Sequence, residues 1–387
     1  MCIRDSIKPY ELGTYDHVQR LETAMGRIIV SSRLEEGLAK LRDDHDSGAH
    51  KLAQIALTIL LDTVRSLRAQ TKSPADFWKA VKMEAWHFSK NGRPAMAAAI
   101  QSHIINSLYV VQNKMLATTL DIDELAVYKL GTVIETAIQA TMASRCRNTL
   151  HMMVPHLLQY IHSFATKKAV SHIVSISSSG TVALCLTALI LDLTAKGIRV
   201  KLTILESRPR FEGVEFVNSL LSRSPHLSSN PMLDIVIVAD ASLASIITEA
   251  DLLVLGADKV LPNGDVSNKI GSCAAAVLAK ILNPGCKVVC VFTTDKITGS
   301  NDLDDEIEYV DGAELRSSWP ERQNEELEKD VNKEGGCRVE VKNWYFEWVE
   351  RKWIDACISE LGVLSAEDIK RIARRSNELE EIVFGDL

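Results

Sequence analysis

The chain has 387 residues, of which 46% are hydrophobic and 25% are charged, and its formal net charge is −7. This length and composition predict two domains of ordinary size and exclude a disordered or fibrous protein. Charges of both signs are dispersed along the sequence, which argues against a nucleic-acid partner. No stretch reaches the roughly 18 unbroken apolar residues of a membrane helix, and the first residues do not resemble a signal peptide. We therefore expect a soluble, cytoplasmic protein without a membrane partner.

The cysteines and histidines give no sign of a metal site. The eight cysteines are scattered without paired close spacings, so we interpret them as reduced thiols. The ten histidines form no HExxH motif, and His151, His156 and His162 lie in a predicted helix, where surface or core roles are favoured. The sequence thus predicts neither a metal ion nor a cofactor.

The first half of the chain has the periodicity of helices. From about Tyr15 to His162 the apolar residues recur at helical spacing, with almost no alternating β-type run. Breaks are predicted at Asp43 to Gly48, at Lys72 to Pro74 and at Asn91 to Pro94. Ser73 before Pro74 is typical of a helix N-cap followed by proline at the first helical position. We expect a helical N-terminal domain over residues 1–165.

The second half alternates between strands and helices. Short apolar runs, HIVSIS, VKLTIL, LDIVIVAD, DLLVLGA and KVVCVFTT, are separated by amphipathic segments of ten or more residues. This alternation predicts an α/β domain over residues 166–387, with a mostly parallel sheet covered by helices on both faces. Ligands of such sheets gather outside the carboxyl ends of the strands, where strand order reverses.

An acidic, polar insertion interrupts this domain at residues 301–336. Its composition favours a solvated loop with one short helix, and a docking segment for a partner is the alternative. A last strand is predicted around Trp344 to Trp348, followed by closing helices from Arg351 onward.

The first strand end carries small hydroxyl residues. Ser177, Ser178, Ser179, Gly180 and Thr181 span the turn between the run HIVSIS and the next helix. Backbone N–H groups and the positive end of a helix dipole suit such a turn for phosphate binding, although serine-rich turns also serve as plain caps. No GxGxxG or GxxxxGK[ST] motif is present, which excludes the familiar dinucleotide and nucleoside-triphosphate turns.

Charged residues follow the later strands. Arg208 lies in ESRPRFEG, where its planar guanidinium suits phosphate oxygens or sugar hydroxyls. Asp258 follows the apolar run LLVLGA, and Lys269 in NGDVSNKIGS is its candidate partner. Asn268 can hydrogen-bond a sugar hydroxyl or shape the loop. A polar cluster this dense between two apolar elements favours a functional role.

These motifs resemble a known family, that of the alpha, beta and delta regulatory subunits of eukaryotic initiation factor 2B with methylthioribose-1-phosphate isomerase and ribose-1,5-bisphosphate isomerase. The resemblance extends from about Ser47 to Asp368. It rests on SGAHKLAQIAL, GRPAMAAAI, ESRPRFEG, GADKVLPNGDVSNKIGS, YFEWV and ELGVLSAEDI. It implies a helical N-terminal domain and a Rossmann-like, NagB/RpiA/CoA-transferase-like C-terminal domain, usually dimeric through the latter.

In the isomerases of this family, which convert an aldose 1-phosphate into a ketose 1-phosphate, a cysteine and an aspartate form the catalytic pair. The aspartate matches Asp258, and a positioned carboxylate suits proton transfer between adjacent carbons. The cysteine position is Ser177, and an alcohol is several pKa units less acidic than a thiol. Of the other thiols, Cys185 is expected to point away, and Cys273 is a minor candidate to replace it. The initiation-factor subunits also lack this cysteine.

The matches divide between the two branches of the family. Family isomerases carry arginine before a Gly-Ala pair where this chain has Ser47, so one anion contact is lost, whereas Arg93 matches a basic position near the ribose-bisphosphate isomerases' site. Asp258 and NGDVSNKIG are closer to the isomerases than to the beta and delta subunits, and alpha subunits usually carry glutamate at this aspartate position.

Two functions are compatible with this pattern. Our leading hypothesis is a protein of the initiation-factor type that binds a phosphorylated pentose or nucleotide and acts in translation initiation by assembly, as a homodimer or with related subunits. The alternative is an aldose-ketose isomerase that uses Asp258 as acid/base with Ser177 in place of cysteine. A third interpretation is a plain scaffold whose pocket binds no phosphorylated pentose or nucleotide.

Overall fold

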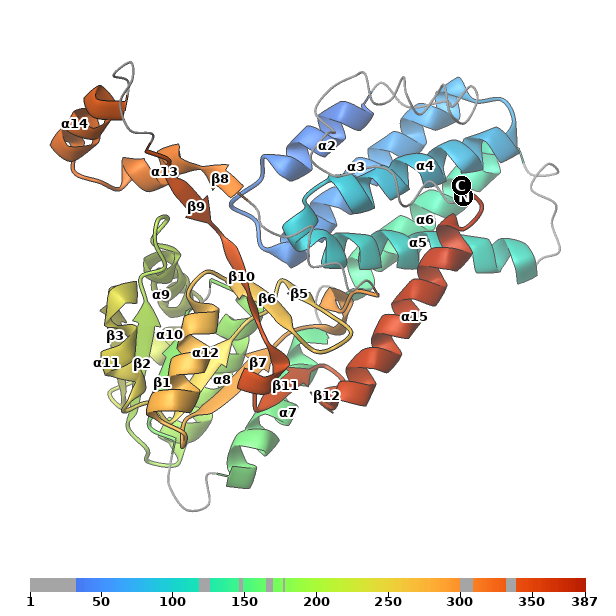
Figure 1. Cartoon of the computed structure of the whole chain (residues 1–387). Coiled ribbons are helices and arrows are strands. Elements are labelled where there is room, and N and C mark those ends of the chain that lie inside the picture. Colours follow the sequence, from blue (N-terminus) through green and yellow to red (C-terminus); the bar gives the residue numbers. More distant parts are fainter. Residues whose placement is uncertain are drawn as a thin grey trace. The chain divides into compact units, whose positions relative to one another are not determined.

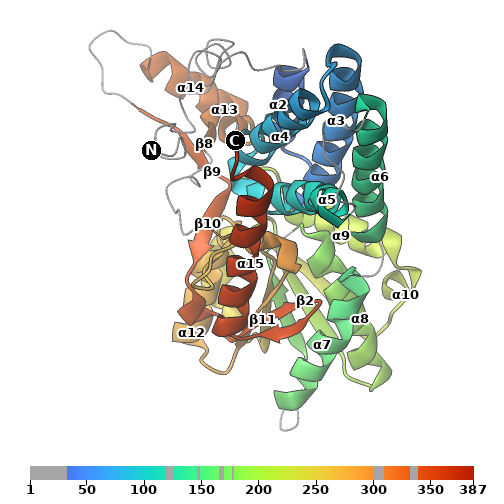
Figure 2. The same ribbon diagram turned by 90° about the vertical axis from the view of Figure 1, so that its right-hand side faces the viewer.

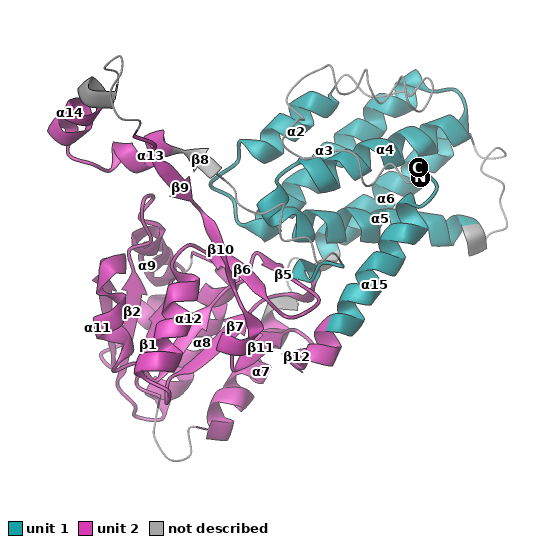
Figure 3. Cartoon of the chain, viewed as in Figure 1, with its two compact units in different colours: residues 1–148, 295–305, 370–387 teal, residues 149–294, 306–369 magenta. Residues whose placement is uncertain are grey.

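The computed structural model describes residues 33–117, 126–145, 149–164, 170–176, 178–299, 309–331 and 339–387. The chain forms two compact units (Figure 3). We call residues 1–148, 295–305 and 370–387 the helical unit, and residues 149–294 and 306–369 the sheet unit. The helix Thr149–Phe164, which precedes the predicted domain boundary after residue 165, belongs to the sheet unit. The boundary itself stays a prediction.

The helical unit is built from amphipathic helices, as their periodicity predicts. They are α2 (Leu34–Arg42), α3 (Ala49–Gln70), α4 (Pro74–Asn91), the short 3₁₀ helix η3 (Pro94–Met96), α5 (Ala97–Ala117) and α6 (Val127–Arg145). Helix α3 packs against α4, α5 and α6, and its apolar stripe is buried, for example at Leu52 and Leu60. Within the described ranges, no helix has both the length and the apolar character to cross a membrane.

The predicted helix breaks coincide with the observed helix ends. Helix α4 begins after Ser73, whose Oγ accepts a hydrogen bond from the backbone N–H of Asp76 at 3.3 Å. Pro74 occupies the first helical position, where its missing N–H costs nothing. The predicted N-cap is therefore confirmed.

The last helix, α15 (Ala366–Phe384), contributes its residues from Lys370 onward to the helical unit. Glu380 on this helix accepts a hydrogen bond from Gln101 Nε2 at 2.6 Å and forms an ion pair with Lys90 at 2.8 Å. Val383 and Phe384 are buried. Polar and apolar contacts together hold the end of the chain against α4 and α5.

The sheet unit contains a seven-stranded sheet with the order β12-β11-β7-β4-β1-β2-β3 (Figure 1). All neighbours are parallel except the β11–β12 pair. The strands are β1 (His172–Ser175), β2 (Val200–Leu205), β3 (Leu233–Val238), β4 (Leu252–Leu255), β7 (Lys287–Val291), β11 (Ala356–Ser359) and β12 (Gly362–Leu364). The first five match the predicted runs, so the mostly parallel sheet is confirmed. The hairpin β11–β12 stands where the sequence had predicted only closing helices.

Strand order reverses beside β1. From β1 the chain proceeds outward through β2 to β3 and then returns to β4 on the other side of β1. Right-handed crossovers place the connecting helices of the two directions on opposite faces. Helices α7 (Thr149–Phe164), α8 (Gly180–Ala195), α9 (Glu212–Arg223) and α10 (Pro225–Ser228) pack together, whereas α11 (Leu243–Ile247) packs with α12 (Ser272–Leu282), and Figure 2 gives a second view of these layers.

Two small sheets complete this unit. One has the order β10-β6-β5, with β5 (Lys259–Val260), β6 (Val266–Lys269) and β10 (Phe346–Val349). The other pairs β8 (Tyr309–Asp311) with β9 (Lys342–Trp344). The described part of the acidic insertion also carries α13 (Gly312–Ser317) and α14 (Glu321–Val331). It is thus more ordered than the loop with one short helix that its polar composition predicts.

We predict that Ser73→Ala lowers the free energy of unfolding of the helical unit by about 1 kcal/mol, because an N-cap hydrogen bond is lost. Urea unfolding followed by circular dichroism measures this change. Ser66→Ala, inside α3, is the matched control, since alanine in a helix interior is neutral or slightly stabilising. An equal loss in both variants would contradict the capping role.

Candidate functional site

The carboxyl ends of β1 and β4 lie side by side at the reversal point. In their parallel pairing Ile173 stands opposite Leu252 and Ser175 opposite Val254, and all residues of both strands are buried. Ligands of doubly wound sheets bind outside strand ends at such a point. Ser177, the predicted counterpart of the family cysteine, lies outside the described residues.

Helix α8 begins shortly after β1, and the described residues of its first turn show no side-chain cap from the N-cap residue. Its N-cap residue, Ser179, has extended backbone and makes no side-chain capping hydrogen bond. The first turn contains no acidic residue, Ser178 and Gly180 are exposed, and Thr181 is buried. The first N–H groups of a helix have no partner within the helix and carry the positive end of its dipole. This turn can therefore bind an anion, as the sequence predicts.

Gly271 brings the loop after β6 against the end of β1. It has a φ of +97°, and a Cβ at this position would lie 2.5 Å from Cδ1 of Ile176, the residue that follows β1. The left-handed backbone and the close approach both require glycine. The two motifs selected from the sequence, SSSGT and NGDVSNKIGS, are thus neighbours in the fold.

The N-terminus of α12 differs from that of α8 because it has its own carboxylate. Glu347 Oε1 accepts a hydrogen bond from the backbone N–H of Cys273 at 2.8 Å. Burial raises the pKa of Glu347, although hydrogen bonds from the N–H groups of Cys273, Gly271 and Ala274 act in the opposite direction. The carboxylate occupies the position that an external anion would take.

Asp258 follows β4 and lies beside β6. Its backbone N–H donates to the carbonyl oxygen of Ser267 at 2.8 Å, and the residue is half-buried. The next residue of β6, Asn268, is buried, and its Nδ2 donates to Ser272 Oγ at 2.8 Å. The predicted catalytic aspartate therefore immediately precedes β5, and the predicted binding amide lies in β6, the strand that pairs with β5.

Lys269 has a partner that the sequence analysis did not select. Its Nζ lies 2.7 Å from Glu212 Oε2 and 4.9 Å from the centre of the Tyr345 ring, and its side chain is 9% exposed. The sequence had proposed Asp258 as the partner of this lysine. The ion pair joins the loop after β2 to β6, so a third strand end reaches the cluster. Glu212 and Tyr345 were within reach of sequence reasoning, because both lie in the motifs ESRPRFEG and YFEWV.

The acidic insertion contributes Glu314 to the same cluster. The Tyr345 hydroxyl donates to Glu314 Oε2, which also accepts from Asn343 Nδ2 at 3.1 Å, and Arg210 Nε lies 3.4 Å from Glu314 Oε1. Burial and the bond to Glu314 raise the pKa of Tyr345, which keeps it a hydrogen-bond donor. Helix α13 is thereby joined to the loop after β2, a link without any signal in the sequence.

The side chain of Arg208 contacts two residues of its own loop. Its Nε lies 3.7 Å from Glu206 Oε1, its guanidinium carbon lies 5.1 Å from the centre of the Phe211 ring, and its side chain is 45% exposed. The loop is held by Asp240, whose carboxylate accepts the backbone N–H groups of Ser207 at 2.9 Å and Arg208 at 2.8 Å.

Arg93, the remaining predicted ligand residue, belongs to the helical unit. It is 3% exposed, and its Nη1 donates to the carbonyl oxygen of Asp44. Ser47 donates its backbone N–H to Asp44 Oδ1 at 2.8 Å. Arg93 therefore fixes the loop before α3, and its contribution to ligand binding stays a prediction.

The thiols near the cluster are not activated. Burial raises the pKa of Cys185 to about 12. Burial also raises the pKa of Cys273, as do the charges of Glu347 and Glu350. A thiolate is the reactive form of cysteine, so both environments disfavour acid/base chemistry by these groups. Five cysteines in the described ranges form no disulfide: Cys185, Cys273, Cys286, Cys290 and Cys357.

The fold and the site define a class, namely an α/β protein with a doubly wound sheet whose carboxyl edge carries a polar cluster and an uncapped helix. A sequence model of the Initiation factor 2 subunit family matches residues 46–366. This match covers most of the chain, and the chain belongs to that family.

Parts of the chain are similar to proteins that are named as sugar-phosphate isomerases. The chain is 27% identical over 220 residues to a methylthioribose-1-phosphate isomerase from Exiguobacterium sibiricum, covering 55% of this chain and 58% of that protein. It is 29% identical over 171 residues to a ribose 1,5-bisphosphate isomerase from Archaeoglobus fulgidus, covering 44% and 48%. The matches thus span about half the length of these relatives.

Among solved structures, the tetrameric initiation factor 2B beta2–delta2 complex from Chaetomium thermophilum contains a similar chain. The TM-score is 0.58 with 13% identity, covering 89% of this chain and 94% of that one. At this identity the similarity shows the fold, and the predicted fold class is confirmed.

We predict that Cys273 is alkylated slowly by iodoacetamide. Its pKa is raised, so its pH profile should lie above that of an ordinary thiol, which titrates near about 8.5. Glu347→Gln removes one negative charge and should shift the profile to lower pH. Peptide mass spectrometry of the native protein, with the urea-unfolded protein as control, measures both profiles. A midpoint at or below about pH 7 would identify an activated thiol.

Proposed function

We propose that this chain binds a phosphorylated pentose at the carboxyl edge between β1 and β4 and acts through binding rather than catalysis. The observation that carries the proposal is the N-terminus of α8, whose N-cap residue Ser179 makes no side-chain capping hydrogen bond. This helix follows β1, and Asp258 follows the neighbouring strand β4. Phosphate binds well to backbone N–H groups at a helix N-terminus. Carboxylate and amide groups such as Asp258 and Asn268 are suited to sugar hydroxyls.

The charge balance of the cluster supports the choice of α8 as the phosphate site. The ammonium group of Lys269 is neutralised by Glu212, and the N-terminus of α12 is capped by Glu347. Helix α8 has neither a side-chain cap at Ser179 nor an acidic residue in its first turn. An added dianion is therefore best stabilised there.

The proposal of binding without turnover rests on the thiols. Position 177 is serine, and the pKa values of Cys185 and Cys273 are both raised. An aldose-ketose isomerisation needs groups that give and take protons near neutral pH, and none of these three groups is suited to that. Ligand binding would then regulate assembly, with itself or with related subunits, in translation initiation.

An isomerase is the second candidate. It is favoured by Asp258 at the strand end and by the relatives that are named as sugar-phosphate isomerases. The same relatives support a phosphorylated pentose as the ligand in either case. The two functions differ in turnover, not in the class of ligand.

Ser179→Asp tests the phosphate site. We expect at least a tenfold loss of affinity for ribose 1-phosphate in calorimetry, because the new carboxylate occupies the helix end and repels the ligand. The same change should raise the free energy of unfolding by about 1 kcal/mol, since it supplies the missing cap. Ser222→Asp, on the exposed face of α9, makes the same charge change and should leave affinity unchanged. Equal affinity in all three proteins would refute the site.

A turnover assay distinguishes the two functions. The purified chain is incubated with methylthioribose 1-phosphate and with ribose 1,5-bisphosphate, and ketose formation is followed by NMR. We expect no ketose above the rate without protein. Turnover that Asp258→Asn abolishes while the ligand still binds would establish the isomerase and overturn the regulatory proposal.

A further inference from the structure

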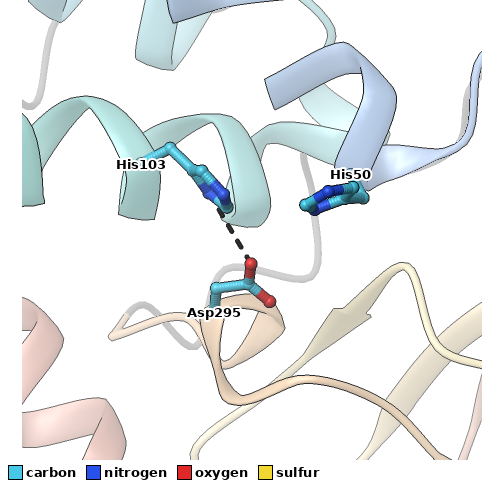
Figure 4. A group of neighbouring side chains, drawn as sticks. All are labelled: His50, His103 and Asp295. Carbon is cyan, nitrogen blue, oxygen red and sulfur yellow. Dashed lines mark ion pairs between the residues drawn. The ribbon is translucent and has the colours of Figure 1, made fainter. Parts of the chain in front are cut away.

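Three side chains from distant parts of the sequence converge in the helical unit (Figure 4). His50 lies in the first turn of α3, His103 lies in α5, and Asp295 lies in the short 3₁₀ helix η6 (Thr294–Lys296). One ligand atom from each of the three lies within 4.8 Å of the others. His50 lies in the motif SGAHKLAQIAL, whereas His103 and Asp295 lie outside the motifs selected from the sequence.

Burial and hydrogen bonding fix the central imidazole. His103 is fully buried, and its Nδ1 lies 2.8 Å from the carbonyl oxygen of Ala99. A carbonyl oxygen only accepts hydrogen bonds, so this contact holds a proton on Nδ1 and leaves the lone pair of the neutral ring on Nε2. A carbonyl that orients a histidine in this way is the usual outer partner of a metal-binding imidazole.

The other two groups complete a donor set. Asp295 Oδ2 lies 3.6 Å from His103 Nδ1, the ring nitrogen that keeps its proton, and the Asp295 side chain is 10% exposed. The donor set itself rests on the ligand atoms of the three residues, which lie within 4.8 Å of one another. The rings of His50 and His103 are 5.8 Å apart between centres, at an interplanar angle of 68°. Two imidazoles and a carboxylate are thus in reach of one point. A simple ion pair between His103 and Asp295 would not require the second ring.

We propose that His50, His103 and Asp295 bind a divalent transition-metal ion of the Zn²⁺ type. Two imidazole nitrogens and one carboxylate suit such ions, whereas Ca²⁺ and Mg²⁺ prefer oxygen ligands alone. Ligands at about 2.0–2.1 Å from a tetrahedral Zn²⁺ are about 3.4 Å from one another, so ligand atoms up to 4.8 Å apart must approach by up to about 1.4 Å. His50 is half-buried near a helix end and can supply this movement. Three protein ligands leave a fourth position for water.

The site departs from the sequence expectation of no metal. Residues 50, 103 and 295 share no spacing motif, because the fold alone brings α3, α5 and η6 together. The inference does not depend on the proposed sugar-phosphate function, since it uses neither the N-terminus of α8 nor Asp258.

The test uses the full-length chain without an affinity tag, freed of metal with a chelator. We expect one Zn²⁺ per chain by calorimetry. His50→Gln and Asp295→Asn should each weaken binding at least about tenfold, because loss of a direct ligand costs no less than loss of an outer partner. His226→Gln, at an exposed position of α10, is the matched control and should bind as the wild type does. Circular dichroism establishes that each variant is folded.

Co²⁺ reports the ligand type without any variant. Nitrogen and oxygen ligands give visible d–d bands alone, whereas cysteine ligands add a thiolate charge-transfer band in the near ultraviolet. Visible bands without the thiolate band are the expected result. The proposal is overturned if the wild type binds no Zn²⁺, if binding persists in both His50→Gln and Asp295→Asn, or if the Co²⁺ spectrum shows thiolate ligation.

Discussion

The parallel pairing of β1 with β4 is the constraint on which the rest of the candidate site depends. The chain leaves β1 toward β2 and later returns to β4 on the other side of β1. The segments that follow β1 and β4 therefore turn toward opposite faces of the sheet, but they start side by side at its carboxyl edge. Helix α8 begins at one end and Asp258 follows the other. Gly271, with its positive φ, then allows the loop after β6 to approach Ile176. Any residue with a side chain at position 271 would meet that isoleucine.

Electrostatics makes the neighbouring helix ends unequal. Glu347 caps α12, and Glu212 neutralises Lys269, so the cations and helix dipoles around the cluster already have carboxylate partners. Helix α8 has none of its own at its N-cap. Glu314, from the acidic insertion, bonds to Tyr345 and lies near Arg210. Side chains of α13 therefore attach the insertion to the site.

Much of this arrangement could be predicted from sequence, and the reasons for the rest are physical. Apolar runs predicted β1, β2, β4 and β7 because strands buried on both faces are continuously apolar. The edge strand β3 is only partly buried and was predicted from its β-branched residues. The hairpin β11–β12 was missed because its strands are only 4 and 3 residues long, which is too short for a clear apolar pattern. The partner of Lys269 was assigned to Asp258 in the same motif, whereas the fold supplies Glu212 from another strand end. The grouping of His50, His103 and Asp295 could not be predicted from the sequence, because no spacing rule links residues of three helices that come together only in the folded chain.

Amide hydrogen exchange of the first turn of α8 tests the central claim most directly. Ribose 1-phosphate bound at the uncapped helix end would accept hydrogen bonds from the amides of residues 180–182, so exchange in peptides that cover them should slow on titration with the ligand. Peptides from the capped N-terminus of α12 serve as the internal reference and should change less. Protection that is absent from α8, or that appears only elsewhere, would contradict the account.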